Sequence, residues 1–363
     1  MTEKSIKFID KFVIRAILYL LSPFFKKQRE FKYLDFNSYN SFLVIRPGGI
    51  GDAVLLLPLL RFLKNKNKQV DILCMKRNSG IIKIFQKEGV VRNLYLLEKF
   101  SSVANCRANK YDCIVDTEQS FSASILLAKM ISAKVIVGFV SPLRLIYYNS
   151  FVIYYQERYE ARCFLDLLKV FNINVDLDNN DLNIDQNIKS SISLPPGRIV
   201  TLFTGASMPW RKPSLEFFIQ IISDLSILFD AIIIIGGKGE AIDAKELAKV
   251  SNKVHDYTGK CSIDDSLYIL KNSKVFISTD SGPLHMGLLA STSVIFGIFG
   301  PGIYQKWCHQ GKMILVSSNF PWNPVSYGRF SQPIWHPFVK DHFNKIDSKE
   351  IISKIKNHER NTI

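Results

Sequence analysis

The sequence has few of the residues that build zinc sites, disulfide frameworks or membrane spans. Its 363 residues include six cysteines and six histidines. The cysteines are scattered singly, with no C-x-x-C pair and no cysteine–histidine cluster at zinc spacing. We therefore expect reduced thiols and a cytoplasmic protein.

Long hydrophobic runs are scarce as well. The apolar stretch near the N-terminus, residues 12–25, is interrupted by Arg15 and Ser22 and is shorter than the roughly 20 residues of a spanning helix. It continues into the basic segment 26–29 without the small-residue cleavage site of a signal peptide. Two interpretations stay open: a helix lying on a membrane surface, or a helix packed on the protein.

Acidic residues are too few to balance the basic ones. The chain has 47 Lys and Arg against 32 Asp and Glu, a formal charge of +15. Such an excess favours an anionic partner: a phosphorylated ligand, nucleic acid or acidic lipid. No nucleic-acid motif accompanies the charge, so specific nucleic-acid binding is not expected.

Apolar runs alternate with helical patterns along most of the chain, which is typical of parallel sheets with crossover helices. The length fits about two domains. Strands are predicted at 42–46, 70–74, 113–116 and 135–138 in a first set, and at 199–203, 231–235, 275–278 and 294–299 in a second. Helices are predicted at 52–64 and 122–132.

Residues 172–197 are rich in Asn and Asp and end in Pro195-Pro196-Gly197, so they break the pattern and suggest an interdomain connection. We predict an N-terminal extension at 1–40, a first Rossmann-like domain at 41–194 and a second at 195–363, with a final helix packing back. That helix has an apolar stripe of Ile346, Ile351, Ile352 and Ile355.

The first informative segment is a glycine-rich turn after the first predicted strand, R-P-G-G-I-G-D, residues 46–52. Ligands of doubly wound sheets bind at this edge, although the spacing matches neither a dinucleotide fingerprint nor a P-loop. Arg46, Gly48, Gly49 and Gly51 are candidate ligand-binding residues, and the resemblance described below implies that they serve the acceptor side. Asp52 is either a helix N-cap or a general base for an attacking hydroxyl.

The second segment, S-T-D-S-G-P-L-H-M-G, residues 278–287, joins a strand to a helix that Pro283 starts. The backbone N–H groups of Ser281, Gly282 and the first helical turn suit a pyrophosphate, and His285 is one turn further. Alternatively, Asp280 and Ser281 are caps and His285 is a core histidine. The density of polar groups favours a ligand site.

Two further loops supply candidate donor contacts. The loop after the first strand of the second domain carries Ser207, Arg211 and Lys212, and one of its cations is expected to offset charge on a departing diphosphate. Glu240 follows a glycine turn. It either binds ribose hydroxyls or is an acidic residue that stabilises the first turn of a helix. The D-x-D sequence at Asp176 is interpreted as a solvated loop and not as a metal site.

Together, residues 46–52, residues 205–212 and the D-S-G-P-L-H turn, followed by Phe299-Gly300-Pro301, resemble the heptosyltransferase family, glycosyltransferase family 9. The similarity runs from about residue 41 to about residue 355. It implies an α/β GT-B fold, two Rossmann-like domains with parallel sheets facing across a central cleft. By position, Asp52 matches the family's general base.

The same resemblance assigns the donor site. Asp280, Ser281, Gly282 and His285 match contacts to the donor's nucleotide and phosphates, and Ser207 and Glu240 match further donor-binding positions. The order Trp210-Arg211-Lys212-Pro213 departs from the family, where a lysine is followed closely by Trp-Pro. We assign Lys212 to the diphosphate as a catalytic cation and Arg211 to donor binding, with the choice between them open.

The resemblance also implies the reaction: inverting sugar transfer without a metal or other cofactor, usually from ADP-L-glycero-D-manno-heptose to an inner-core lipopolysaccharide sugar. The implied partners are a nucleotide-sugar donor, a glycan or glycolipid acceptor, and the anionic inner face of the cytoplasmic membrane. Two alternatives are a nucleotide-sugar epimerase of GT-B type and a non-catalytic protein that binds nucleotide sugars or polyanions.

Overall fold

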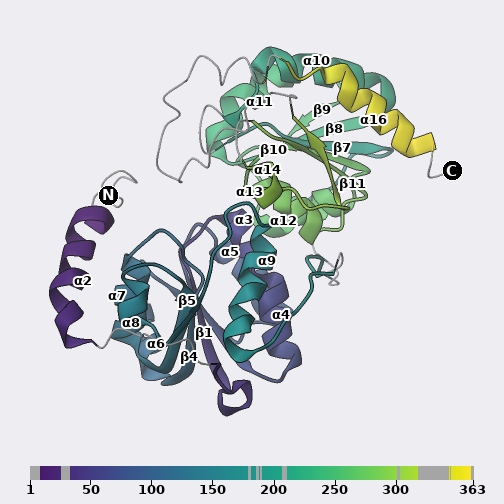
Figure 1. Ribbon diagram of the computed structural model, residues 1–363. Helices are drawn as coiled ribbons and strands as arrows, with labels where there is room; N and C mark the ends of the chain where they lie inside the picture. Colours follow the sequence, from purple (N-terminus) through teal and green to yellow (C-terminus); the bar gives the residue numbers. More distant parts are fainter. Residues whose placement is uncertain are drawn as a thin grey trace. The chain divides into compact units, whose positions relative to one another are not determined.

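A computed structural model describes residues 9–25, 33–178, 181–184, 188, 190–206, 211–300, 303–317, 343 and 345–360. The chain divides into two compact units, Met1–Asp181 and Leu182–Ile363 (Figure 1). This division falls earlier than the expected boundary at Pro195. The segment after it packs with the second unit, because the Ile184 N–H donates to the Leu289 carbonyl and the Ser190 hydroxyl donates to Asp265.

The first unit is built on one parallel sheet of six strands in the order β3-β2-β1-β4-β5-β6. The strands are β1 (Ser41–Arg46), β2 (Gln69–Cys74), β3 (Asn93–Leu96), β4 (Tyr111–Asp116), β5 (Ala133–Phe139) and β6 (Ser150–Val152). The chain starts in the middle, builds outward to β3 and then returns to β4. The strand order therefore reverses between β1 and β4, where doubly wound sheets bind ligands.

Helices connect these strands. They are α3 (Ile50–Leu55), α4 (Leu57–Asn65), α5 (Ser79–Lys87), α6 (Phe100–Ala108), α7 (Ala123–Ile131), α8 (Arg144–Tyr147) and α9 (Glu160–Asp166), with 3₁₀ turns η3 (Phe36–Ser38) and η4 (Leu167–Phe171). The single helix expected at 52–64 is divided at Leu56 into α3 and α4. Pro58 lies in the first turn of α4, where its missing N–H is tolerated, whereas it would break a continuous helix.

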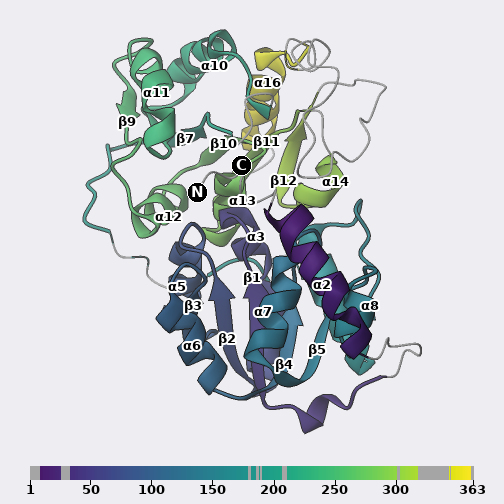
Figure 2. The same ribbon diagram turned by 90° about the vertical axis from the view of Figure 1, so that its left-hand side faces the viewer.

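The N-terminal extension forms a short helical segment on the first unit: η1 (Ile9–Ile14), α2 (Arg15–Leu21) and η2 (Ser22–Phe24). Figure 2 shows α2 beside α7 and α8. Asp10 accepts the backbone N–H groups of Ser122 and Ala123 at 3.1 and 2.7 Å, and Leu18 is buried. Among the described residues, no helix is both long and apolar enough to cross a membrane.

The second unit repeats the first in plan, with a parallel sheet in the order β12-β11-β10-β7-β8-β9. Its strands are β7 (Ile199–Phe203), β8 (Ala231–Ile235), β9 (Val254–Asp256), β10 (Val275–Thr279), β11 (Val294–Ile298) and β12 (Met313–Val316). The order reverses between β7 and β10. The second ligand-binding edge is therefore expected at the carboxyl ends of these two strands.

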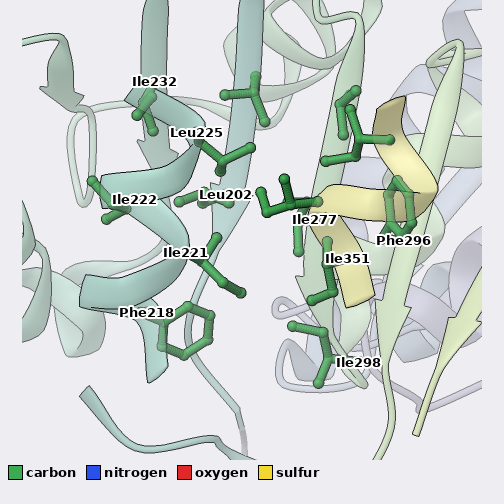
Figure 3. Packing of buried hydrophobic residues seen from close by; sticks show 14 of the residues in the cluster. Leu202, Phe218, Ile221, Ile222, Leu225, Ile232, Ile277, Phe296, Ile298 and Ile351 are labelled. Atoms are coloured by element: carbon green, nitrogen blue, oxygen red, sulfur yellow. The ribbon is translucent and has the colours of Figure 1, made fainter. Parts of the chain in front are cut away.

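The helices of the second unit are α10 (Leu215–Leu228), α11 (Ala241–Leu247), α12 (Ile263–Lys271), α13 (Gly282–Leu289), α14 (Tyr304–Trp307) and α16 (Ser348–Arg360), with the 3₁₀ turn η6 (Lys238–Glu240). Figure 3 shows how α10 packs Phe218, Ile221 and Leu225 toward Leu202 and Ile277 of the sheet. This continuous apolar core holds the strands in place, and with them the polar loops that follow their carboxyl ends.

Three of the four isoleucines of the expected apolar stripe lie on α16, and Ile346 lies just before the helix. Ile346, Ile351, Ile352 and Ile355 are all buried in the core of the second unit. All eight predicted strands are present as well. The sequence did not reveal β3, β6, β9 and β12. These are the short edge strands of the two sheets, where few residues are fully buried and the apolar pattern is weak.

Candidate active site

The reversal point of the first sheet holds Arg46, the last residue of β1. Its side chain is fully buried and donates from Nη1 to the carbonyl of Thr117, which follows β4, at 2.7 Å. The guanidinium carbon Cζ lies 4.8 Å from the centre of the Phe164 ring. From Nη2 the side chain donates to Asp52. Arg46 was expected to belong to the glycine turn, and the structure shows that it ties β1, β4 and α3 together.

Asp52 lies in the first turn of α3 and not at its N-cap, which is Gly49. One carboxylate oxygen accepts the Gly49 N–H at 2.7 Å, and the other pairs with Arg46. The side chain keeps 12% of its surface exposed, whereas that of Arg46 has none. Asp52 therefore stabilises the helix start and still presents a carboxylate to solvent.

Close packing explains the glycine at position 48. A Cβ there would lie 2.7 Å from Asp52 atoms and 2.8 Å from the Arg46 Nε, distances that real side chains do not tolerate. Arg77 fixes the turn by donating to the Gly48 and Pro47 carbonyls at 2.9 and 3.1 Å. Gly51 is buried in the first turn of α3. The turn is therefore wrapped tightly around the Arg46–Asp52 pair.

A second carboxylate, which was not predicted, lies near the same arginine. Glu160, the first residue of α9, is fully buried with Oε1 3.6 Å from Arg46 Nη2. Gln119 donates to Oε1 at 2.8 Å and the Tyr154 hydroxyl donates to Oε2 at 2.5 Å. Burial and the charge of Glu160 raise the pKa of Tyr154 well above its ordinary value.

The reversal point of the second sheet is tied in a parallel way. The hydroxyl of Thr279, the last residue of β10, donates to the Gly205 carbonyl in the loop after β7. Thr279 also lies 3.5 Å, oxygen to oxygen, from the Ser281 hydroxyl. In each unit, therefore, the two central strands are joined by one side chain at the edge where a ligand is expected.

Asp280 follows β10 and is buried, with its carboxylate 3.7 Å from Arg211 Nη1. Burial raises the pKa of Asp280, and the charge of Arg211 opposes part of that rise. The structure thus brings together two of the predicted donor contacts, Arg211 and Asp280.

Helix α13 begins where the sequence predicted. Ser281 is its N-cap in an extended conformation, Gly282 is its first residue, and Pro283 is in the first turn. His285 is buried, and its ring stands edge-on to that of Trp307 at 6.1 Å between centroids. The histidine therefore packs inside the second unit, close to the same helix start.

Lys212 and Glu240 lie around the neighbouring loops. Lys212 forms an ion pair with Asp243 on α11, and Glu240 accepts the Gly237 N–H at 2.8 Å. A Cβ on Gly205 would lie 2.4 Å from the Glu240 Cγ, so the loop after β7 packs directly on Glu240. Asp243, as the partner of Lys212, was not predicted.

Two expectations concern residues around these loops. Ser207 lies outside the described residues. Asp176 of the D-x-D sequence is fully exposed, with its carboxylate 3.8 Å from Arg162. Within the ranges that the structure describes, no group of three or more His, Cys, Asp or Glu side chains could hold a metal ion. All six cysteines are free thiols.

No family model and no curated protein matches the sequence. Solved structures do match: E. coli heptosyltransferase WaaC with ADP-2-deoxy-2-fluoro heptose has 15% identity, covers 88% of this chain and 99% of its own, and gives a TM-score of 0.70. A glycosyl transferase family 9 protein from Veillonella parvula has 16% identity, 90% and 98% coverage, and a TM-score of 0.72. E. coli ADP-heptose lps heptosyltransferase II has 13% identity, 87% and 98% coverage, and a TM-score of 0.66.

These matches confirm the expected resemblance to heptosyltransferases of glycosyltransferase family 9 at the level of the fold. The chain has the GT-B type of architecture, two Rossmann-like units each with a six-stranded parallel sheet. The likeness extends over nearly the full length of the solved chains.

Proposed function

We propose that this chain is an inverting glycosyltransferase that moves heptose from ADP-heptose to a lipopolysaccharide core or related glycan acceptor without a metal ion. The observation that carries the proposal is the pair of polar sites at the two sheet reversal points, one built around Asp52 and the other around Asp280 and α13. The fold match to a heptosyltransferase solved with an ADP-heptose analogue supports this choice of donor.

In the proposed reaction, Asp52 is the general base. An acceptor hydroxyl gives its proton to the Asp52 carboxylate, and its oxygen forms a bond to the anomeric carbon of the donor sugar. The bond from that carbon to the diphosphate oxygen breaks with both electrons leaving on the nucleoside diphosphate. Attack from the side opposite the leaving group inverts the anomeric configuration.

The second unit is proposed to hold the donor. The N-terminus of α13, with Ser281 and Gly282, supplies backbone N–H groups to the diphosphate, and the helix dipole adds attraction. Lys212 and Arg211 are the cations proposed to offset charge as the diphosphate leaves. Glu240 is proposed to bond the ribose hydroxyls, with Ser207, Asp280 and His285 as further donor contacts.

Pairing of these cations with carboxylates leads to a specific proposal for Lys212. It pairs with Asp243 while Arg211 pairs with Asp280. A diphosphate carries more charge than either carboxylate, so it competes for both cations when it binds. We therefore propose that the donor draws Lys212 from Asp243, and Asp243→Asn is expected to strengthen ADP binding, measured by calorimetry.

The test of the function begins with a thermal-shift panel of ADP-, UDP- and GDP-sugars. ADP-heptose is expected to raise the melting temperature most. Donor and a lipopolysaccharide core acceptor are then incubated with and without a chelator, and the product's anomeric configuration is read by NMR. A retained configuration, or loss of transfer on chelation, contradicts the proposal, and a changed sugar in donor-only samples identifies an epimerase instead.

The N-terminal helix is proposed to rest on an anionic membrane surface. One side packs on the first unit through Leu18, while Phe12, Tyr19, Leu20 and Phe24 are exposed, with Phe24 82% exposed. Residues 1–32 contain eight Lys and Arg, and Asp10, one of the three acids there, is buried as a partner of α7. An exposed apolar face in a segment whose sequence is rich in basic residues suits insertion among acidic lipid headgroups.

Flotation with vesicles tests this surface. The full chain is expected to float with vesicles of phosphatidylglycerol and phosphatidylethanolamine, less so at high salt, and not with phosphatidylcholine alone. Leu20→Ser with Phe24→Ser should release the protein. Equal flotation of this double variant and the parent would show that the exposed face does not contact lipid.

A further inference from the structure

The most informative cluster outside the predicted residues is the second carboxylate at Arg46. Arg46 donates to Asp52 from Nη2, and Glu160 Oε1 lies 3.6 Å from the same nitrogen. Neither Arg46 nor Glu160 has exposed side-chain surface, whereas that of Asp52 is 12% exposed. One buried cation is therefore shared by two carboxylates of different exposure.

Arg46 alone would make Asp52 a poor base. An arginine beside a carboxylate favours its charged form and typically lowers such a pKa by about 1–3 units. A carboxylate held in this way accepts a proton from a sugar hydroxyl less readily. A second negative charge on the same arginine acts in the opposite direction, because like charges disfavour one another's ionised forms.

The surroundings fix the position of the second carboxylate. Glu160 is the first residue of α9, where the helix dipole favours a negative charge. It also accepts hydrogen bonds from Gln119 at 2.8 Å and from Tyr154 at 2.5 Å. These contacts hold the Glu160 carboxylate in place beside Arg46, whereas Asp52 is the carboxylate that keeps exposed surface.

Two further charged residues lie on the segments that hold Arg46 and the glycine turn. Arg77, which follows β2, donates to the Gly48 and Pro47 carbonyls. Glu118, in the loop after β4, accepts the backbone N–H groups of Gln119 and Ser120 at 3.0 Å each.

We propose that Glu160 is a positioning residue which, by sharing Arg46 with Asp52, keeps Asp52 basic enough to accept the proton of an acceptor hydroxyl. This proposal rests on the proposed function of Asp52. Glu160 does not touch substrate in it. Its charge acts through Arg46, and Gln119 regulates the effect by occupying the Glu160 oxygen nearest to the arginine.

Two variants are expected to shift the titration midpoint of Asp52 in opposite directions. Glu160→Gln keeps the shape and an oxygen for Gln119 but removes the charge, so the titration midpoint of Asp52 should fall by about one pH unit. Gln119→Ala frees Oε1 to compete for Arg46, so the midpoint should rise. Glu160→Asp retains the charge and should stay near the parent value.

The midpoint is measured by ¹³C NMR of the carboxyl carbons, and the signal of Asp52 is identified by its absence in Asp52→Asn. A second measurement is the acidic limb of the pH profile of kcat/KM. ADP binding, measured by calorimetry, should be unchanged in all variants. A structural role alone would not give opposite shifts, so equal midpoints or shifts of one sign would overturn the proposal. If Glu160→Gln does not fold, the proposal is tested by Gln119→Ala alone: a raised Asp52 midpoint supports it, and an unchanged or lowered midpoint overturns it.

The NMR titration also separates this proposal from the proposed function. It uses the protein without substrates, so it gives an answer even when no sugar transfer is found. Opposite shifts without transfer support the coupling and contradict the function, whereas transfer with unmoved midpoints supports the function and contradicts the coupling.

Discussion

At the scale of single residues, Asp52 has a structural contact and a proposed chemical role. Replacing it with Asn retains an oxygen for the Gly49 N–H but removes the proton acceptor. We expect kcat to fall by about 10²–10⁴-fold, with ADP affinity unchanged in calorimetry. Asp35→Asn is the matched control, because Asp35 caps η3 through the Asn37 N–H. A fully active Asp52→Asn protein would remove Asp52 from the mechanism.

Asp280 gives a prediction about pH. Burial raises the pKa of Asp280 on folding, so the folded protein binds this proton more tightly than the unfolded chain. Its contribution to stability is therefore greatest below the ordinary aspartate pKa of about 3.9 and is lost as pH rises through the raised value.

Asp280→Asn should consequently raise the melting temperature at pH 7 and weaken ADP binding. The difference in melting temperature between variant and parent should narrow as the pH is lowered. Differential scanning fluorimetry across pH measures this. A variant that melts below the parent at pH 7 would contradict the prediction.

Two glycines near Glu240 form a matched pair. A Cβ on Gly205 meets the Glu240 side chain, whereas one on Gly239 meets nothing within 4 Å. Gly205→Ala is expected to displace Glu240 and weaken ADP-sugar binding by about tenfold, the loss of roughly one hydrogen bond. Gly239→Ala should leave affinity unchanged, and equal affinities for both would exclude Glu240 from the donor site. Calorimetry compares the two.

At the scale of elements, the N-terminal helical segment and α7 support each other. Asp10 accepts two backbone N–H groups at the start of α7. Asp10→Ala should therefore lower the free energy of unfolding by about 0.5–2 kcal/mol, as for loss of a helix cap. Urea unfolding followed by circular dichroism measures this, and Leu20→Ala, at a position 75% exposed, is the neutral control.

At the scale of the whole molecule, the two units can be followed separately. All four tryptophans, at 210, 307, 322 and 335, belong to the second unit. Ile351→Ala opens a cavity beneath α16 and should destabilise that unit by about 2–5 kcal/mol. Tryptophan fluorescence in urea reports the loss.

Ile227→Ala is the control for this substitution, because Ile227 on α10 is 82% exposed and Ile351 is fully buried. ADP should restore part of the lost stability, since a ligand that binds only the folded state stabilises it. Equal unfolding midpoints for the two variants would show that α16 does not contribute to the core.

Sequence patterns were enough to predict the alternation of strands and helices, the two sets of parallel strands and the polar turns after β1 and β10. These are local features, because apolar runs, glycines and Pro283 restrict the backbone where they occur. The sequence likewise indicated the apolar stripe of α16. The short edge strands were not predicted, because their sequences show little apolar pattern.

Which side chains meet at the strand ends follows from the three-dimensional fold. Glu160 approaches Arg46 from the start of α9, and Thr279 reaches the Gly205 carbonyl. The partners in these pairs are more than 70 residues apart along the chain, so no local spacing encodes the contact. The parallel register of the central strands brings them to one edge, and charge sharing at that edge depends on distance in space.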